Sequence, residues 1–319
     1  MIDYVLSRRL TGGDFGIAMM SLGDVEEPAS CPIAEGPLVT VVLSSYNYAD
    51  FLGQALDSVF EQTYRPIELV VVDDGSSDRS REIIEEKLRS ASIPATPVFQ
   101  ENRGQAAALN AGFALAKGRY ICTLDSDDYW SRDKVARMAA FAERLPDGGV
   151  YQHQLARHSG GVDKPLLLSG DLAAIWRTLG TVNLALRQDV FSVFVPTSGL
   201  MWRTAVLRDI GPIPSALRAC PDAYLTRMAC LRGPLYSNPE ALGTWRDHER
   251  NAGRKDRYGF DKFWLRVIMP VLNEAFAREG EPVRLVYRPA AVVMEPWRLV
   301  REALSRHRAR KAKRSADRE

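Results

Sequence analysis

The chain has 319 residues, of which 46% are hydrophobic and 26% are charged, a composition typical of soluble globular proteins. Its 42 Lys and Arg residues nearly balance its 40 Asp and Glu residues, so the net charge gives no sign of a polyanionic partner. No apolar stretch reaches the roughly 18–20 residues of a membrane span, and the four cysteines lack metal-site or disulfide-framework spacing. We therefore expect a cytoplasmic protein, with contact at the inner face of the membrane as an open alternative.

Strands and helices are predicted to alternate in the first half of the chain. Residues 1–36 show no periodicity and are predicted to be an N-terminal extension. β-Branched apolar runs then predict strands, and apolar residues at helical spacing predict helices. The strands are expected at Leu38–Ser44, Ile67–Val72, Thr96–Gln100 and Arg119–Leu124, and the helices at 52–60, 78–88, Gly104–Lys117 and Ser131–Leu145. This alternation predicts an α/β fold with a mostly parallel, doubly wound sheet.

The pattern loosens after Val150. A strand, or a strand and turn, is expected at Val193–Trp202. The helices are predicted at Asp171–Leu179, Asp222–Arg232, 261–277 and 296–310.

Acidic turns follow two of the predicted strands, at Asp73–Asp78 and Asp125–Asp128. In sheets of this kind, ligands bind at the carboxyl ends of the strands. Paired carboxylates placed there suit Mg²⁺ or Mn²⁺ and, through the metal, a substrate phosphate. A solvated turn that caps the next helix is the alternative for Asp125–Asp128.

Ordered blocks over residues 37–130 resemble the opening of family 2 glycosyltransferases. The blocks are Val41–Asn47, Leu56–Thr63, Glu68–Asp78, Asn102–Gly104, Asn110–Gly112, Gly118–Ile121 and Asp125–Asp128. The resemblance implies a GT-A fold and transfer of a sugar from a nucleotide-diphospho-sugar donor, usually with inversion and a divalent metal. The blocks keep the order and spacing of the family, so the turn Asp125–Asp128, called the Asp-rich turn below, is expected to bind the metal.

The resemblance also implies roles for single residues of the first half. Asp127 is expected to contact Mn²⁺ or Mg²⁺, and Asp125 the ribose or the metal. Asp73 and Asp74 are expected at the donor base, commonly uracil, with Tyr46 packed on that base. An Asx turn is the alternative for the two acids, and strand-end packing is the alternative for Tyr46. Further donor-binding residues are expected to be Ser44, Asn47, Asn102, Gly104 and Arg246.

The catalytic base is expected in the second half, where the family has a Glu-Asp pair at a helix start. Asp222 occupies the Asp position, and Pro221 replaces the Glu. Asp222 is therefore the expected base, with a favourable interaction with the helix dipole as the alternative. By the same resemblance, His248 is expected in the metal or pyrophosphate shell, and Arg246 at phosphate. A structural role is the alternative for His248.

These inferences predict a GT-A domain over 37–250, with a nucleotide-binding half at 37–130 and an acceptor half at 131–250. A helical region with a basic tail is expected at 251–319, and the tail either contacts an anionic membrane or is solvated. The expected partners are a UDP-linked sugar and a sugar or lipid-linked acceptor in surface polysaccharide, glycan or glycolipid synthesis, without nucleic acid. An inactive nucleotide-sugar binder and a sugar nucleotidyltransferase are the alternative functions.

Overall fold

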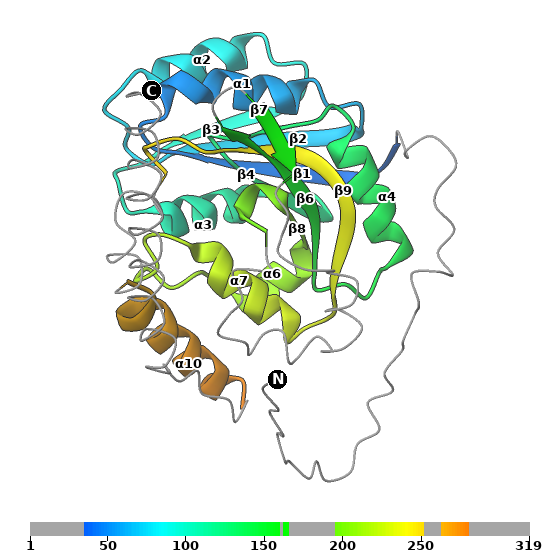
Figure 1. Ribbon diagram of the computed structural model, residues 1–319, viewed down its shortest axis with the longest axis vertical. Helices are drawn as coiled ribbons and strands as arrows, with labels where there is room; N and C mark the ends of the chain where they lie inside the picture. Colours follow the sequence, from blue (N-terminus) through cyan, green and yellow to red (C-terminus); the bar gives the residue numbers. More distant parts are fainter. Residues whose placement is uncertain (1–34, 160–161, 166–194, 252–262, 281–319) are drawn as a thin grey trace, which may run out of the picture. The chain divides into compact units, whose positions relative to one another are not determined.

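The computed structural model describes residues 35–159, 162–165, 195–251 and 263–280 (Figure 1). Contacts within the chain divide it into two compact units, Met1–Phe260 and Asp261–Glu319. The predicted helices Asp171–Leu179 and 296–310 lie outside the described residues, as do the basic tail and residues 1–34 of the expected extension.

The first four strands form a parallel sheet. They are β1 (Glu35–Ser45), β2 (Arg65–Asp73), β3 (Ala95–Phe99) and β4 (Tyr120–Asp125). Strand β1 lies between β2 and β4, and β3 pairs with the outer side of β2. All four lie where their apolar, β-branched runs predict strands, and this confirms the expected α/β fold.

Five further strands extend the sheet beyond β4, in the order β3-β2-β1-β4-β8-β6-β9-β5, with β7 paired to β6. The sheet becomes mixed here, because β8 runs antiparallel to both β4 and β6, whereas β6 and β9 are parallel. Polar residues interrupt β6 and β9, so neither carries the apolar run of a buried strand. The added strands are β5 (Tyr129–Trp130), β6 (Val150–Ser159), β7 (Val162–Pro165), β8 (Leu200–Arg203) and β9 (Leu235–Arg246).

Helices cover both faces of the sheet (Figure 1). On β1, Val39, Val41 and Leu43 belong to the core shared with three helices, whereas Val42 points to the opposite face. There a Cβ atom at Gly112 would lie only 2.3 Å from Val42 Cγ1, so this glycine permits close helix–strand packing. The first face carries α1 (Ala49–Phe60), α2 (Ser80–Arg89) and α4 (Lys134–Arg144), and the other carries α3 (Gln105–Leu115), α6 (Thr204–Ile210) and α7 (Pro221–Cys230).

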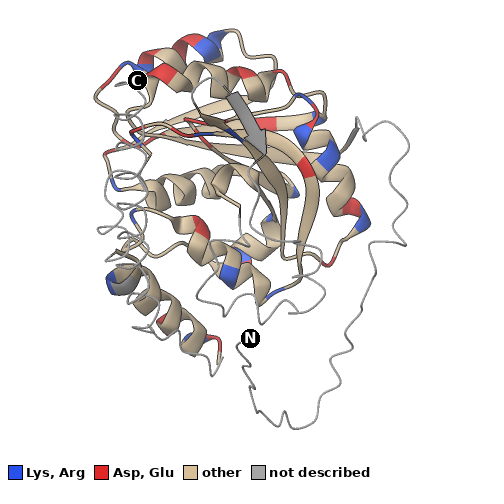
Figure 2. Cartoon of the chain, viewed as in Figure 1, with Lys and Arg blue, Asp and Glu red and all other residues tan. Residues whose placement is uncertain are grey.

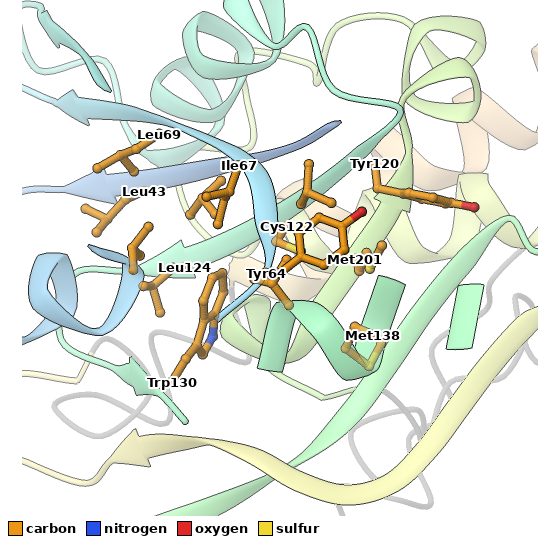
Figure 3. Packing of buried hydrophobic residues seen from close by; sticks show 14 of the residues in the cluster. Leu43, Tyr64, Ile67, Leu69, Tyr120, Cys122, Leu124, Trp130, Met138 and Met201 are labelled. Carbon is orange, nitrogen blue, oxygen red and sulfur yellow. The ribbon is translucent and has the colours of Figure 1, made fainter. Parts of the chain in front are cut away.

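The core under the first face joins strands from both parts of the sheet. Leu43 and Leu124 lie on the side of Trp130, and Met138 of α4 belongs to the same core on the side of Met201 (Figure 3). Full burial of each such side chain contributes about 1.5–3 kcal/mol. The core thereby holds the strand ends, and the polar turns that follow them, in fixed relative positions.

The outer surface of α2 carries charges of both signs (Figure 2). Arg79 pairs with Glu82 and Arg81 with Glu85, each at 3.0 Å. Exposed pairs of this kind contribute about 0.3–0.5 kcal/mol each. This helix therefore presents an ordinary solvated face.

The second unit contains a π-helical turn, Trp264–Ile268, that leads into α10 (Met269–Arg278). The sequence predicts a helix over 261–277, and the described part agrees with it. Among the residues that the structure describes, no helix has the length and apolar character needed to cross a bilayer.

His153 on β6 makes the fold sensitive to acid. The side chain is fully buried, and its Nε2 has no hydrogen-bond partner among the described residues. Burial, followed by the nearby charge of Lys134, lowers the pKa of His153 to about 3. Below its usual pKa of 6.5, the unfolded chain therefore binds a proton that the folded chain does not.

We expect the free energy of unfolding to fall by about 1.4 kcal/mol through this group between about pH 7.5 and about pH 5.5. His153→Asn keeps an N–H group near the position of Nδ1 and removes the titrating ring. Urea unfolding at both pH values should show a smaller loss for the variant than for the unsubstituted protein. Equal losses would contradict the assignment of this pH dependence to His153.

Candidate active site

The polar turns meet at the carboxyl ends of the central parallel strands. Ser45 of β1 pairs in register with Asp73 of β2, and Ser44 pairs with Asp125 of β4. The register therefore brings both acidic turns and the turn after β1 to one edge of the sheet, as the sequence predicts.

The turn after β1 is locked to the turn after β2. Asn47 has a left-handed backbone (φ 56°). Its N–H donates to Ser76 Oγ at 2.9 Å, and its Oδ1 accepts the N–H of Ser77 at 2.8 Å. Tyr46 beside it is 47% exposed, so its ring is not packed into the strand end. An exposed aromatic face at this edge can stack on a planar base.

Asp73 and Asp74 are buried and hold loops. Asp73 accepts hydrogen bonds from the N–H and Oγ of Ser76, three residues on and therefore one residue beyond the reach of an Asx turn. Asp74 accepts hydrogen bonds from Gln100 Nε2 at 2.6 Å and from the backbone N–H groups of Arg103 and Gly104 at 2.9 and 2.7 Å. Asp74 therefore fixes the loop that leads into α3, and contact of either acid with a base stays a prediction.

The start of α3 is covered by a distant loop. Gly104 has φ 91°, and a Cβ atom there would lie 2.7 Å from the carbonyl oxygen of Arg218, so glycine is required. Arg218 Nη2 donates to Asn102 Oδ1 at 2.5 Å, and the N–H of Gln105 donates to the Arg218 carbonyl at 2.8 Å. Asn102 and Gly104 thus join two parts of the site that are far apart in the chain.

Asp125, Asp127 and Asp128 form a compact acid cluster, with one carboxylate oxygen from each lying within 4.8 Å of the others. Burial raises the pKa of Asp125, and the charges of Asp127, Asp128 and Asp222 raise it further. Burial also raises the pKa of Asp127, while His248 opposes that shift. Crowded carboxylates of this kind are stabilised by a bound cation.

Asp125 and Asp127 suit a divalent cation, but Asp128 is fully committed to the protein. Among the described residues, Asp125 Oδ1 accepts Gln105 Nε2 at 2.7 Å, and no hydrogen bond reaches its Oδ2. In Asp127, Oδ2 is the oxygen contacted by His248 Nε2 and Asn251 Nδ2. No hydrogen bond from another described residue reaches its Oδ1. Two hard oxygen ligands with open positions fit Mg²⁺ or Mn²⁺. Asp128 is 0% exposed and accepts Ser198 Oγ at 2.5 Å and the N–H of Arg246 at 2.9 Å.

Arg246 holds the backbone of the acid cluster at Asp127. It is 8% exposed, and its guanidinium donates to the carbonyl of Asp127 at 3.0 Å and to Gln54. The same group lies over the rings of Phe51 and Tyr129, at 5.2 and 4.7 Å. The described contacts place this group among protein partners, and its expected phosphate contact stays a prediction.

His248 faces Asp127, with Nε2 3.1 Å from Asp127 Oδ2. Its Nδ1 accepts the N–H of Arg250 at 3.2 Å, which assigns the proton of the neutral ring to Nε2. In this arrangement His248 donates to Asp127 and has no lone pair for a metal. Its position agrees with the expected neighbourhood of the metal, and its role as a direct ligand stays a prediction.

Asp222 reaches the same site from α7. The residue before this helix, Cys220, has φ 53°, and Pro221 is the first residue of the helix. The charge of Asp222 contributes to the raised pKa values of both Asp125 and Cys220, so its carboxylate lies near both groups. Burial raises the pKa of Asp222, and Arg227 opposes the shift. The expected base therefore lies within electrostatic range of Asp125, one of the two acids expected at the metal.

Sequence reasoning missed several residues that hold these carboxylates. Gln105 binds Asp125, and Asn251 Nδ2 lies 3.4 Å from Asp127 Oδ2. Ser198 Oγ binds Asp128 and also accepts the N–H of Asp125 at 3.1 Å. Asn251 and Ser198 have a local signal, because Asn251 lies three residues after His248 and Ser198 lies within the expected strand and turn at Val193–Trp202. The other contacts cross the fold.

Comparisons with known proteins identify the family of the chain. The family model described as Glycosyl transferase family 2 matches residues 40–209. An uncharacterised glycosyltransferase of Nostoc sp. strain PCC 7120 is 35% identical over 222 residues, which cover 67% of this chain and 66% of the relative. The Escherichia coli UDP-Glc:alpha-D-GlcNAc-diphosphoundecaprenol beta-1,3-glucosyltransferase WfaP is 37% identical over 108 residues, covering 33% of this chain and 41% of that protein. The chain thus spans about two thirds or less of these relatives.

Two solved structures share the fold. Staphylococcus aureus TarS 1-349 in complex with UDP-GlcNAc has a TM-score of 0.57 and 21% identity, over 75% of this chain and 66% of that one. The Pyrobaculum calidifontis mannosyltransferase PcManGT, in complex with GDP-Man and Mn²⁺, has a TM-score of 0.53 and 18% identity, over 86% and 84%. At these identities the likeness establishes the fold alone.

Proposed function

The chain belongs to glycosyl transferase family 2, and from that premise we propose that it transfers a sugar from a UDP-linked donor to an acceptor hydroxyl, with inversion and with a divalent metal. It is a glycosyltransferase related to enzymes of polysaccharide biosynthesis. The observation that carries the proposal is the cluster of Asp125, Asp127 and Asp128 at the carboxyl end of β4, with Asp222 of α7 close enough for its charge to raise the pKa of Asp125.

Asp222 acts as the general base in the proposed reaction. Its carboxylate accepts the proton of the acceptor hydroxyl while the acceptor oxygen bonds to the anomeric carbon. The bond from that carbon to the diphosphate oxygen breaks in the same step, so the configuration inverts. The raised pKa of Asp222, which burial causes, makes its carboxylate a better proton acceptor than a solvated one.

Asp125 and Asp127 are the residues that would hold the divalent cation. When bound, such a cation neutralises the charge that develops on the leaving diphosphate. The protein's own contribution is to orient both carboxylates, through Gln105 for Asp125 and through His248 and Asn251 for Asp127.

The donor nucleotide is proposed to be uridine diphosphate, with Tyr46 stacked on the base. The exposed ring of Tyr46 supports this arrangement, and both the name of WfaP and the TarS complex include UDP-linked sugars. The PcManGT structure instead contains GDP-Man, so the choice of nucleotide needs a direct test. A lipid-linked acceptor, as in the name of WfaP, is the proposed acceptor class.

Calorimetric titration with UDP and with GDP, each with Mn²⁺ and with EDTA, tests this proposal. We expect UDP to bind at least about tenfold more tightly than GDP, a difference of about 1.4 kcal/mol, and only in the presence of Mn²⁺. Tighter binding of GDP would overturn the nucleotide assignment, and equal binding of UDP in EDTA would overturn the metal. Transfer from UDP-sugars is then followed by mass spectrometry, where binding without transfer would favour an inactive nucleotide-sugar binder.

A further inference from the structure

Phe51, on the first turn of α1, lies at the centre of a group of basic and aromatic side chains. We call this group the Phe51 cluster; it comprises Tyr48, Phe51, Arg246, His248 and Arg250. The Phe51 ring stacks on the His248 ring, with centroids 4.7 Å apart and planes 19° apart. The guanidinium groups of Arg246 and Arg250 lie 5.2 and 5.1 Å from its centroid. One half-buried ring thus contacts three groups from the end of β9 and the segment that follows it.

That segment carries the groups that contact Asp127. His248 Nε2 and Asn251 Nδ2 reach its carboxylate, and Arg246 Nη1 donates to its carbonyl oxygen. Phe51 touches two of these three residues but makes no described contact with Asp127 itself. Any effect of Phe51 on Asp127 must therefore pass through the segment.

The orientation of His248 depends on its neighbours on every side. Phe51 packs on the face of the imidazole, and Tyr48 meets it edge-on, with centroids 5.6 Å apart. The N–H of Arg250 holds Nδ1, and Arg250 is itself anchored to Asp50 of α1 at 2.7 Å. With its face, edge and Nδ1 held, the ring directs Nε2 toward Asp127 Oδ2 at 3.1 Å, while Asn251 Nδ2 lies 3.5 Å from the same nitrogen.

We propose that Phe51 is a positioning residue of the donor site, which acts through His248 to hold Asp127 in the orientation that binds the donor. This inference rests on the proposed function, since it assigns Asp127 to the donor site. An aromatic ring is required because a flat face stacks on imidazole and attracts the two guanidinium groups. A leucine fills similar space without offering that face.

The test compares Phe51→Leu with Phe60→Leu and Phe51→Tyr. Phe60 is the matched control, because it is a half-buried phenylalanine at the other end of α1 that packs against the core. The readouts are the dissociation constant of UDP in Mn²⁺ by calorimetry, the KM and kcat of transfer, and the thermal unfolding midpoint.

We expect Phe51→Leu to raise the dissociation constant of UDP and the donor KM by roughly tenfold, the size of one aromatic interaction. Phe60→Leu should lower the unfolding midpoint at least as much and leave UDP binding within about twofold. Phe51→Tyr keeps the aromatic face and should bind within about threefold of the unsubstituted protein. Equal binding by both leucine variants would overturn the proposal.

A double-mutant cycle with His248→Ala tests the route. If Phe51 acts through His248, Phe51→Leu should change UDP binding by less than about twofold once the imidazole is absent. Additive effects would overturn the route through His248. The unsubstituted protein is measured first, and absence of UDP binding by it would overturn the proposed function together with this inference. Normal binding with unresponsive Phe51 variants would overturn the inference alone.

Discussion

Asp222→Asn is expected to lower the kcat of sugar transfer by about 10²–10⁴-fold, the range contributed by a positioned general base. Asparagine keeps the size and shape of the side chain but cannot accept a proton at neutral pH. Since Asp222 lies on α7 and not in the Asp-rich turn, UDP binding in Mn²⁺ should stay within about threefold. Transfer rates at saturating donor and calorimetry on the same preparations measure the two effects.

Asp209→Asn is the matched control for this substitution. Asp209 lies on α6, is largely exposed and pairs with Arg232 at 2.7 Å, so its replacement should leave transfer within about twofold. A kcat for Asp222→Asn above about one tenth of the original value would remove Asp222 from the role of base. The family has a Glu where this chain has Pro221, and Asp222 also has a favourable position near the helix dipole. The test therefore distinguishes a catalytic role of Asp222 from a structural role at the helix start.

Asp127→Asn is expected to abolish the strengthening of UDP binding by Mn²⁺ and to lower transfer by about 10³-fold. The substitution removes one of two carboxylates with an oxygen that accepts no described hydrogen bond, while His248 can still donate to the amide oxygen. Loss of several kcal/mol of charge stabilisation corresponds to about three powers of ten in rate. Calorimetry with UDP, with and without Mn²⁺, separates binding from chemistry.

The same variant should unfold at a higher temperature than the unsubstituted protein in EDTA. Burial raises the pKa of Asp127, so its ionised form destabilises the folded chain near neutral pH. A neutral side chain removes that penalty, and differential scanning calorimetry measures the shift. UDP binding that still strengthens with Mn²⁺ in Asp127→Asn would contradict the assigned metal contact, and a lower unfolding temperature would show that the carboxylate stabilises the fold.

The nucleotide-binding half of the fold could be predicted because its signals are local. Each of β1, β2 and β4 is a continuous apolar run followed directly by polar residues, and each lies near its predicted position. Once four such strands are parallel, the polar residues after them must share one edge of the sheet. The positions of Asp73 and Asp125 follow from that reasoning.

The second half of the sheet could not be predicted in this way. Strand β6 reads Val-Tyr-Gln-His-Gln-Leu-Ala-Arg-His-Ser, with polar residues where a buried strand normally has apolar ones. Its partners β8 and β9 come from distant parts of the chain. Strand β8 runs antiparallel to β6, whereas β9 runs parallel to it. Such pairing depends on contacts between strands and leaves little trace in either segment.

The sequence by itself determined the fold class, the family resemblance and which acidic residues gather at the sheet edge, since these depend on residue types within a few positions of one another. Only the tertiary structure decided how those acids are held. Gln105 orients Asp125, and Ser198 and Arg246 donate hydrogen bonds to the carboxylate of Asp128. Phe51 stacks on His248. These contacts join segments that folding alone brings together, and side-chain direction at a crossing depends on the packing of both segments.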